Sequence, residues 1–200
     1  HPDFDYALIQ SDRGLLILAE ELKQDCLERY QLSGTTLATC KGQALEHLPL
    51  QHPFEARPVG IICGKHVTLD AGTGLVHTAP AHGLDDYVVG QKYNLPSDSP
   101  VDGSGKFLDS TALVGGLSVW KANDVVIDTL KTSGHLFCLK KIDHSYPHCW
   151  RHKTPIIFRA TPQWFIGMNQ HRSNGTETLR ELAMQAVEST AFFPAWGRAR

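Results

Sequence analysis

The pattern of apolar and polar positions near the start of the chain predicts a hairpin followed by a helix. Phe4–Gln10 and Leu15–Ala19 have the alternation and composition of strands. The polar cluster Ser11–Gly14 between them is typical of a tight turn. Glu20–Tyr30 carries apolar residues four positions apart, which is the spacing of one helix face.

The remainder of the chain alternates short strands, helices and loops. We expect strands at Thr35–Cys40, Val59–Ile62, His66–Asp70, Leu75–Thr78, Leu136–Ile142 and Ile156–Arg159. We expect helices at Asp85–Tyr93, Ala122–Ser133 and Leu179–Val187, with Asn94 as a left-handed stop and Gly134 as the end of the second helix. This mixture predicts an α+β fold. After residue 144 the chain becomes aromatic, basic and broken by prolines, so we expect one domain over residues 1–144 and a connecting limb over residues 145–200.

Composition narrows the class of protein. The chain has 200 residues, 42% hydrophobic and 20% charged, with a net charge of −2. These values are those of an ordinary globular protein and give no reason to expect free-standing nucleic-acid binding. No apolar run has the length of a membrane span. The chain opens at His1-Pro2 without Met, so we expect it to be a piece of a larger protein.

The cysteines indicate the compartment. The five are odd in number, widely scattered and without a CxxC pair, which favours a reducing cytoplasm over a disulfide framework. We expect all five to be small buried hydrophobes.

Candidate chemistry is concentrated between Gly72 and Tyr87. Asp85 and Asp86 begin a predicted helix, where the partial positive charge of the helix start stabilises a carboxylate by about 0.3–1 kcal/mol. Starting a helix is what such residues usually do. An ionised Asp86 beside a small pocket would also pair well with a substrate ammonium group.

His77 lies in a predicted strand a few residues earlier. Near neutral pH its imidazole could orient a water, accept a proton or hydrogen-bond a ribose hydroxyl, although an isolated histidine is more often a satisfied core residue. A metal site at His77, His82, Asp85 and Asp86 is disfavoured, because the spacing does not match helical zinc pairs and Pro80 and Gly83 interrupt the segment. Cys149 with His152 is at best half of a zinc site. We therefore expect no metal.

Three segments carry a resemblance to a known family. They are Gly72–Tyr93, the pair Ser145-Tyr146-Pro147 and Cys149-Trp150-Arg151, and Ala160–Phe165. With them the whole chain resembles the inserted editing domain of isoleucyl-tRNA synthetases, which are class I aminoacyl-tRNA synthetases, together with the limb that returns to their nucleotide-binding core. Valyl enzymes typically have Lys, and leucyl enzymes Met, at the position of His77.

The resemblance implies a β-barrel-like domain with packed helices, and hydrolysis of valine mistakenly attached to isoleucine tRNA. Asp86 would hold the α-ammonium group and His77 would lie beside the ester. The implied pocket for the small amino acid comprises Gly74, Val76, His77, Thr78, Ala79 and Asp86. The fragment itself would need no cofactor, whereas the parent synthetase would use ATP and Mg to ligate isoleucine to its tRNA.

Two departures and two alternatives accompany this resemblance. The threonine-rich segment that forms one wall of the family's editing pocket lies upstream of where this chain begins, and the synthetic signatures are absent, so the isolated fragment is expected to lack full activity. The chain could instead be a non-catalytic module that docks tRNA or a protein partner through the limb around Trp150. A metal-dependent hydrolase at His77, His82 and Asp86 is the third interpretation.

Overall fold

The computed structural model of the chain describes residues 1–141, 143, 145–171 and 175–199. The chain divides after Ala160 into two units, His1–Ala160 and Thr161–Arg200. Residue 144, where the sequence predicts a boundary, lies outside the described residues. The division into an editing domain and a limb at that residue stays a prediction.

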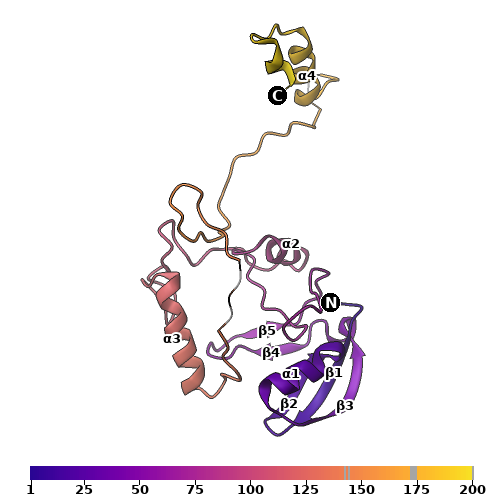
Figure 1. The fold of residues 1–200 in the computed structure, drawn as a ribbon, viewed down its shortest axis with the longest axis vertical. Coiled ribbons are helices and arrows are strands. Elements are labelled where there is room, and N and C mark those ends of the chain that lie inside the picture. Colours follow the sequence, from indigo (N-terminus) through magenta and orange to yellow (C-terminus); the bar gives the residue numbers. More distant parts are fainter. Residues whose placement is uncertain (142, 144, 172–174, 200) are drawn as a thin grey trace. The chain divides into compact units, whose positions relative to one another are not determined.

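An antiparallel sheet of three strands forms the N-terminal part of the first unit (Figure 1). β1 (Asp5–Ser11) lies between β2 (Gly14–Ala19) and β3 (Gly34–Lys41). The predicted hairpin is confirmed, since Ser11 pairs with Gly14 and the Ser11 hydroxyl donates to the Gly14 carbonyl over 2.8 Å. The short turn sets the register of the two strands and thereby decides which side chains face the core.

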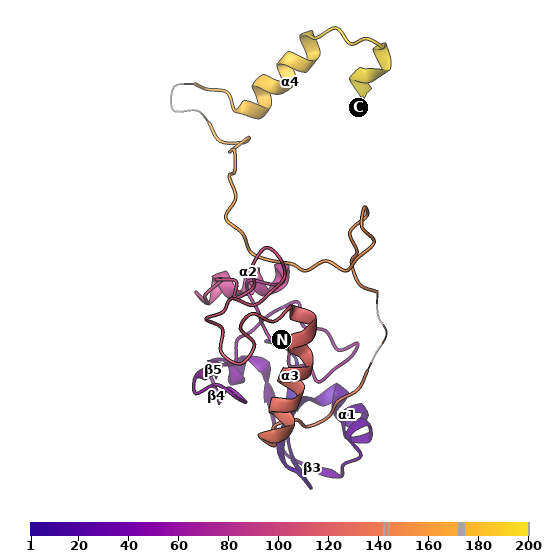
Figure 2. The same ribbon diagram turned by 90° about the vertical axis from the view of Figure 1, so that its left-hand side faces the viewer.

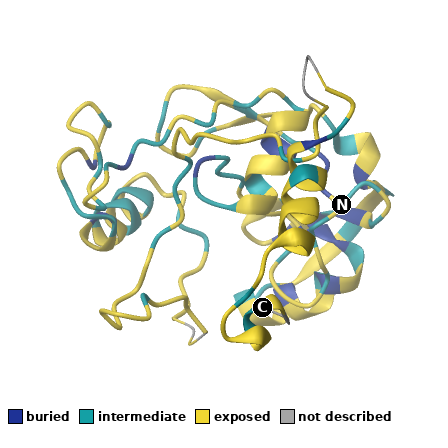
Figure 3. Cartoon of the chain, turned by 90° about the horizontal axis from the view of Figure 1, so that it is seen from above, coloured by how far each residue is buried: buried dark blue, intermediate teal, exposed yellow. Residues whose placement is uncertain are grey.

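The main hydrophobic core lies between this sheet and the following helical segment. A 3-10 turn, η1 (Glu20–Leu22), leads into α1 (Lys23–Tyr30). The buried cluster consists of Tyr6, Ala7, Ile9, Leu18, Ala19, Leu22, Cys26 and Leu27. Figure 3 shows buried residues in this part of the chain, while about half of the residues of α3 (Val119–Thr132) are half-buried or buried. Complete burial of a side chain such as Ile9 contributes about 1.5–3 kcal/mol, so this cluster is the main apolar contribution to the unit's stability.

A second group of elements follows in the same unit. In chain order they are η2 (Gly42–Leu45), β4 (Pro49–Gln51), β5 (Pro58–Gly60) and α2 (Leu84–Lys92), with β4 and β5 paired antiparallel. Tyr93, directly after α2, connects them: its hydroxyl donates to the Glu46 carboxylate and accepts from the Cys63 backbone N–H at 3.1 Å. This hydrogen bond lowers the pKa of Glu46 below its ordinary value. The end of α2 is thereby attached to the segment around β4 and β5.

Residues 100–105 form a turn before α3. The Asp102 carboxylate accepts from the backbone N–H groups of Ser104 at 2.8 Å and Lys106 at 3.0 Å. Ser118 then caps α3 by accepting from the backbone N–H of Lys121. α3 is a single helix (Figure 2), and Gly134 ends it with a φ of 76°.

The second unit, Thr161–Arg200, contains α4 (Leu179–Ser189) and a short 3-10 turn, η3 (Ala195–Ala199). A reciprocal capping box starts α4: Glu181 N–H donates to the Thr178 hydroxyl, and Thr178 N–H donates to the Glu181 carboxylate. The helix predicted here is confirmed.

Several expected strands are wrong. Residues 66–70, 75–78 and 156–159 lie in no sheet, nor do the described residues 136–141; Ile142 lies outside the described residues. In each case a short run of apolar or β-branched residues suggested a strand, but among the described residues none of these runs pairs with a neighbouring strand.

The fold class is a mixture of helices and strands, but the described strands do not form a closed barrel. The two sheets are open, with three strands and two strands. Sheets of this size have free edges on both sides and cannot close. Among the described residues no helix is both long enough and apolar enough to cross a bilayer.

The five cysteines do not share one environment. Cys26 and Cys63 are buried, Cys40 and Cys149 are half-buried, and Cys138 is exposed, so the expectation of five buried cysteines is confirmed for Cys26 and Cys63 only. Burial raises the pKa of the Cys26 thiol, and it does the same for the Cys63 thiol. Both thiols are therefore held in the unreactive protonated form.

We predict that a thiol reagent at mildly alkaline pH labels Cys26 and Cys63 at least about tenfold more slowly than Cys138, because the thiolate is the reactive species and the reagent must also reach it. Time-resolved labelling with peptide mass spectrometry measures the individual rates. Cys138→Ser should remove the fastest phase. Labelling of Cys26 as fast as that of Cys138 would contradict the burial.

Candidate functional site

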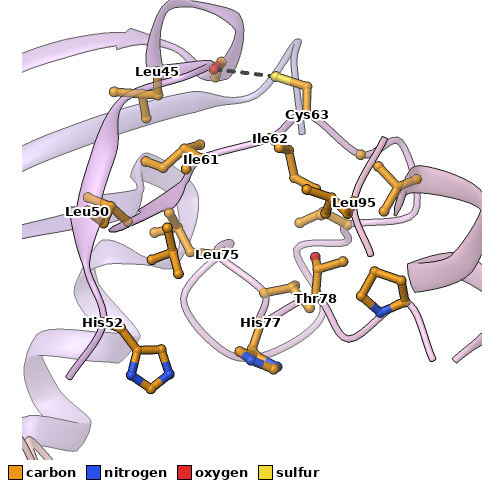
Figure 4. Close-up of a pocket in the computed structure, with 18 of the residues that line it drawn as sticks. Leu45, Leu50, His52, Ile61, Ile62, Cys63, Leu75, His77, Thr78 and Leu95 are labelled. Atoms are coloured by element: carbon orange, nitrogen blue, oxygen red, sulfur yellow. Dashed lines mark hydrogen bonds between the residues drawn. The ribbon is translucent and has the colours of Figure 1, made fainter. Parts of the chain in front are cut away.

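A cavity of about 920 Å³ opens in the first unit, and most of its wall is aliphatic. Figure 4 shows Leu50, Ile61, Ile62, Leu75 and Leu95 around it, with the imidazoles of His52 and His77 on the side opposite Ile61 and Ile62. The Cys63 thiol lies on the same side as Ile61 and Ile62, away from the two imidazoles, and is 3.7 Å from the Gly42 carbonyl oxygen. The cavity thus combines a large apolar surface with a few imidazole groups, as ligand pockets usually do.

The glycine loop Gly72–Gly74 forms the base of the segment that carries His77. The Tyr6 hydroxyl donates to the Gly74 carbonyl at 2.7 Å, and the Ala19 N–H donates to the Thr73 carbonyl at 2.9 Å. Gly74 has a φ of 76°, and a Cβ built on it would lie 2.4 Å from the Ala19 Cβ. Only glycine can adopt this positive φ without strain and fit into the space beside Ala19.

Four of the predicted pocket residues line the cavity: Gly74, Val76, His77 and Thr78. His77 is exposed, and within the described part of the chain its imidazole has no hydrogen-bond partner. The interpretation of His77 as a satisfied core histidine is therefore wrong. A free imidazole beside an apolar wall is available to a ligand.

Ala79 and Asp86 are not among the lining residues. Asp86 is half-buried in the first turn of α2, and its Oδ2 would lie 2.2 Å from a Cβ at Gly83. The carboxylate therefore lies over the residue that precedes the helix, close to the unpaired N–H groups of its first turn. Asp85, its neighbour, is exposed. Of the two, Asp86 is the carboxylate held against the loop that leads from His77.

His82 has a structural partner. Its Nδ1 lies 2.9 Å from the Phe158 carbonyl oxygen, and the neighbouring Ala81 carbonyl accepts from the Ala160 N–H at 2.7 Å. Because a carbonyl can only accept, Nδ1 carries the proton. In the described residues no three His, Cys, Asp or Glu side chains converge on a point that could hold a metal ion. His77, His82 and Asp86 therefore do not form the metal centre considered from the sequence.

Sequence reasoning missed most of the cavity wall. His52, Ile61, Ile62 and His66 come from the segment around β4 and β5, and Leu95 follows α2. This segment precedes His77 in the sequence and carries no motif. The only local sign of this wall in the sequence is Gly64, two residues before His66. A Cβ on Gly64 would lie 2.5 Å from the His66 imidazole, so the glycine leaves room for that ring.

The chain is similar to known proteins over its whole length. It is 68% identical to the isoleucine–tRNA ligase of Nitrosomonas europaea, 59% identical to that of Thiobacillus denitrificans and 54% identical to that of Dechloromonas aromatica. Each match covers 100% of this chain and 22% of the relative, so the chain spans about a fifth of their length. No profile of a protein family matches the chain.

The glycine loop gives a direct test of the geometry. Gly72→Ala should lower the free energy of unfolding by about 1–2 kcal/mol, because Gly72 has a φ of 82° but open space around it. Gly74→Ala should cost about 1–3 kcal/mol more, because it adds the overlap with Ala19. Urea unfolding of both variants measures the difference. Equal losses would show that Gly74 is not packed against the sheet.

Proposed function

The chain corresponds over its whole length to a segment of the isoleucine–tRNA ligases, and on that premise we propose that it is their editing domain. It would hydrolyse the ester of valine mistakenly attached to isoleucine tRNA, while the parent protein ligates isoleucine to that tRNA with ATP and Mg in the cytoplasm. The observation that carries the proposal is the unpartnered His77 imidazole at an aliphatic cavity.

The chemistry of amino-acid selection explains why such a site is needed. Valine and isoleucine differ by one methylene, which is worth about 1–3 kcal/mol in a binding pocket. A synthetic site that accepts isoleucine therefore also accepts valine at a level that translation cannot tolerate. A second site that admits valine, excludes isoleucine and cleaves the ester supplies the missing discrimination.

In this proposal His77 and Asp86 have different roles. His77, at the cavity, lies beside the ester and the amino-acid side chain, where it limits size and orients polar atoms or water. Asp86, close to the N–H groups that open α2, binds the α-ammonium group of the substrate. The aliphatic lining from Leu75 and the β4–β5 segment supports the apolar part of the ligand.

The size role of His77 leads to a gain-of-activity prediction. In the full-length ligase, His77→Ala should begin to hydrolyse correctly charged Ile-tRNA, because removal of the imidazole opens space for the additional methylene. Parallel deacylation assays with Ile-tRNA and Val-tRNA measure the effect. Misfolding lowers activity and cannot produce this gain. If Ile-tRNA remains intact while Val-tRNA is cleaved at the wild-type rate, His77 has no part in the pocket.

The proposed role of the Asp86 charge predicts that removing it slows the hydrolysis of Val-tRNA. Asp86→Ala in the full-length ligase should slow Val-tRNA deacylation by about ten- to a hundredfold, because a charge-assisted hydrogen bond to the ammonium contributes about 1.5–3 kcal/mol. Asp85→Ala is the matched control, since it removes the same charge from the same helix turn but from an exposed position. Equal losses in the two variants would assign the effect to the helix start instead of the substrate.

A further inference from the structure

A small loop in the first unit has features that the editing site does not use. Residues 149–154, named here the Trp150 loop, are closed by two backbone hydrogen bonds: Cys149 N–H to the Thr154 carbonyl at 2.9 Å, and Lys153 N–H to the Cys149 carbonyl at 2.8 Å. His148 and Pro155 form a bridge just outside it. Lys153 has a φ of 56°, which tightens the turn. The loop is therefore a defined turn and not an irregular excursion.

The base of this loop is attached to the unit. The Ile156 N–H donates to the Pro147 carbonyl at 3.1 Å, and the Arg159 Nε donates to the Val101 carbonyl at 2.8 Å. Ile157 lies beside Gly105, 3.8 Å from where a Cβ would be. These contacts close the hairpin and attach the residues that follow the loop to the unit. Trp150, Arg151, His152 and Lys153 at its tip are all exposed.

The tip offers an aromatic face and cations together. Trp150 is 75% exposed, and the Arg151 guanidinium lies over its ring at 4.6 Å from the centroid. Among the described residues the Arg151 N–H groups have no side-chain hydrogen bond, so they are available for phosphate oxygens. In the described part of the chain neither Arg151 nor Lys153 has an ion pair.

The sequence around the Trp150 loop contains basic residues but no acidic ones. From His144 to Thr176 there is no Asp or Glu, although the chain as a whole has a net charge of −2. Packing against an uncharged protein surface would leave these cations desolvated and unpaired, which is costly. A partner that carries its own negative charge and a flat aromatic group avoids that cost. Nucleic acids have both properties.

We propose that the Trp150 loop is an RNA-contacting surface, in which Trp150 stacks on an unpaired base while Arg151 and Lys153 bind the adjacent phosphates. That this RNA is tRNA rests on the proposed function. The site is separate from the His77 cavity, since none of the three residues lines it. The loop would anchor the nucleic acid without taking part in ester hydrolysis.

Binding of an uncharged isoleucine tRNA transcript to the full-length ligase, titrated over a series of salt concentrations, tests this inference. Trp150→Ala should weaken binding about five- to a hundredfold, the effect of losing one base–aromatic stack, and Trp150→Phe should restore most of it. Arg151→Gln and Lys153→Gln should each reduce the slope of log affinity against log salt by about one. Lys131→Gln is the matched control, because this exposed lysine lies beside Asp128 on α3.

The outcomes separate this inference from the editing proposal. Wild-type affinity and an unchanged salt slope in the Trp150, Arg151 and Lys153 variants would overturn the RNA surface alone. A lower thermal midpoint of the Trp150→Ala ligase with unchanged affinity would show that the loop packs against protein, which also overturns it. Failure of the wild-type ligase to bind the transcript would instead contradict the proposed function.

Discussion

The two hydrogen bonds that hold the glycine loop to the sheet determine where the candidate site lies. Tyr6 and Ala19 belong to the buried core, and they fix the carbonyls of Gly74 and Thr73. The Cys26 thiol and the Arg29 guanidinium also lie within hydrogen-bond distance of the Gly72 carbonyl, at 3.1 and 3.3 Å. Gly74 has a φ of 76°, so the chain turns there, and residues from Leu75 to Thr78 follow the cavity wall. The three-stranded sheet and α1 thus serve as a rigid base for a site that they scarcely line.

The position of Asp86 links helix stability with ligand binding. Its carboxylate lies at the start of α2, where the helix contributes about 0.3–1 kcal/mol to the ionised form. A charge-assisted hydrogen bond to an ammonium group contributes about 1.5–3 kcal/mol, which is the larger effect. In the proposed function the substrate ammonium group is therefore a stronger partner for Asp86 than the helix start. Binding of the ammonium group can then draw the carboxylate away from Gly83.

The sequence predicted the parts of the fold that depend on local patterns. The hairpin at Ser11–Gly14, the helices α1 to α4 and the glycine and asparagine stops are all set by turn chemistry or by a helical period within a few residues. The segment Leu75–Thr78 was misassigned because alternation alone cannot show whether a partner strand is present. The predicted His77 lies at the cavity, but the opposite wall from Ile61 and Ile62 depends on long-range packing, for which no local pattern exists. Asp86 was correctly placed at a helix start, and no pattern could show that it lies outside the lining.

The size of the cavity limits how it can discriminate between ligands. At about 920 Å³ it is near the upper end of the range of about 300–1,000 Å³ that small-molecule pockets occupy. A single methylene is a minor fraction of such a volume, so the cavity as a whole cannot reject isoleucine by being full. Rejection in the proposed function must therefore arise at one place where the amino-acid side chain meets a fixed group. In the proposed function His77 is the candidate for that group, because it lies at the cavity and follows a backbone that the glycine loop holds against the core.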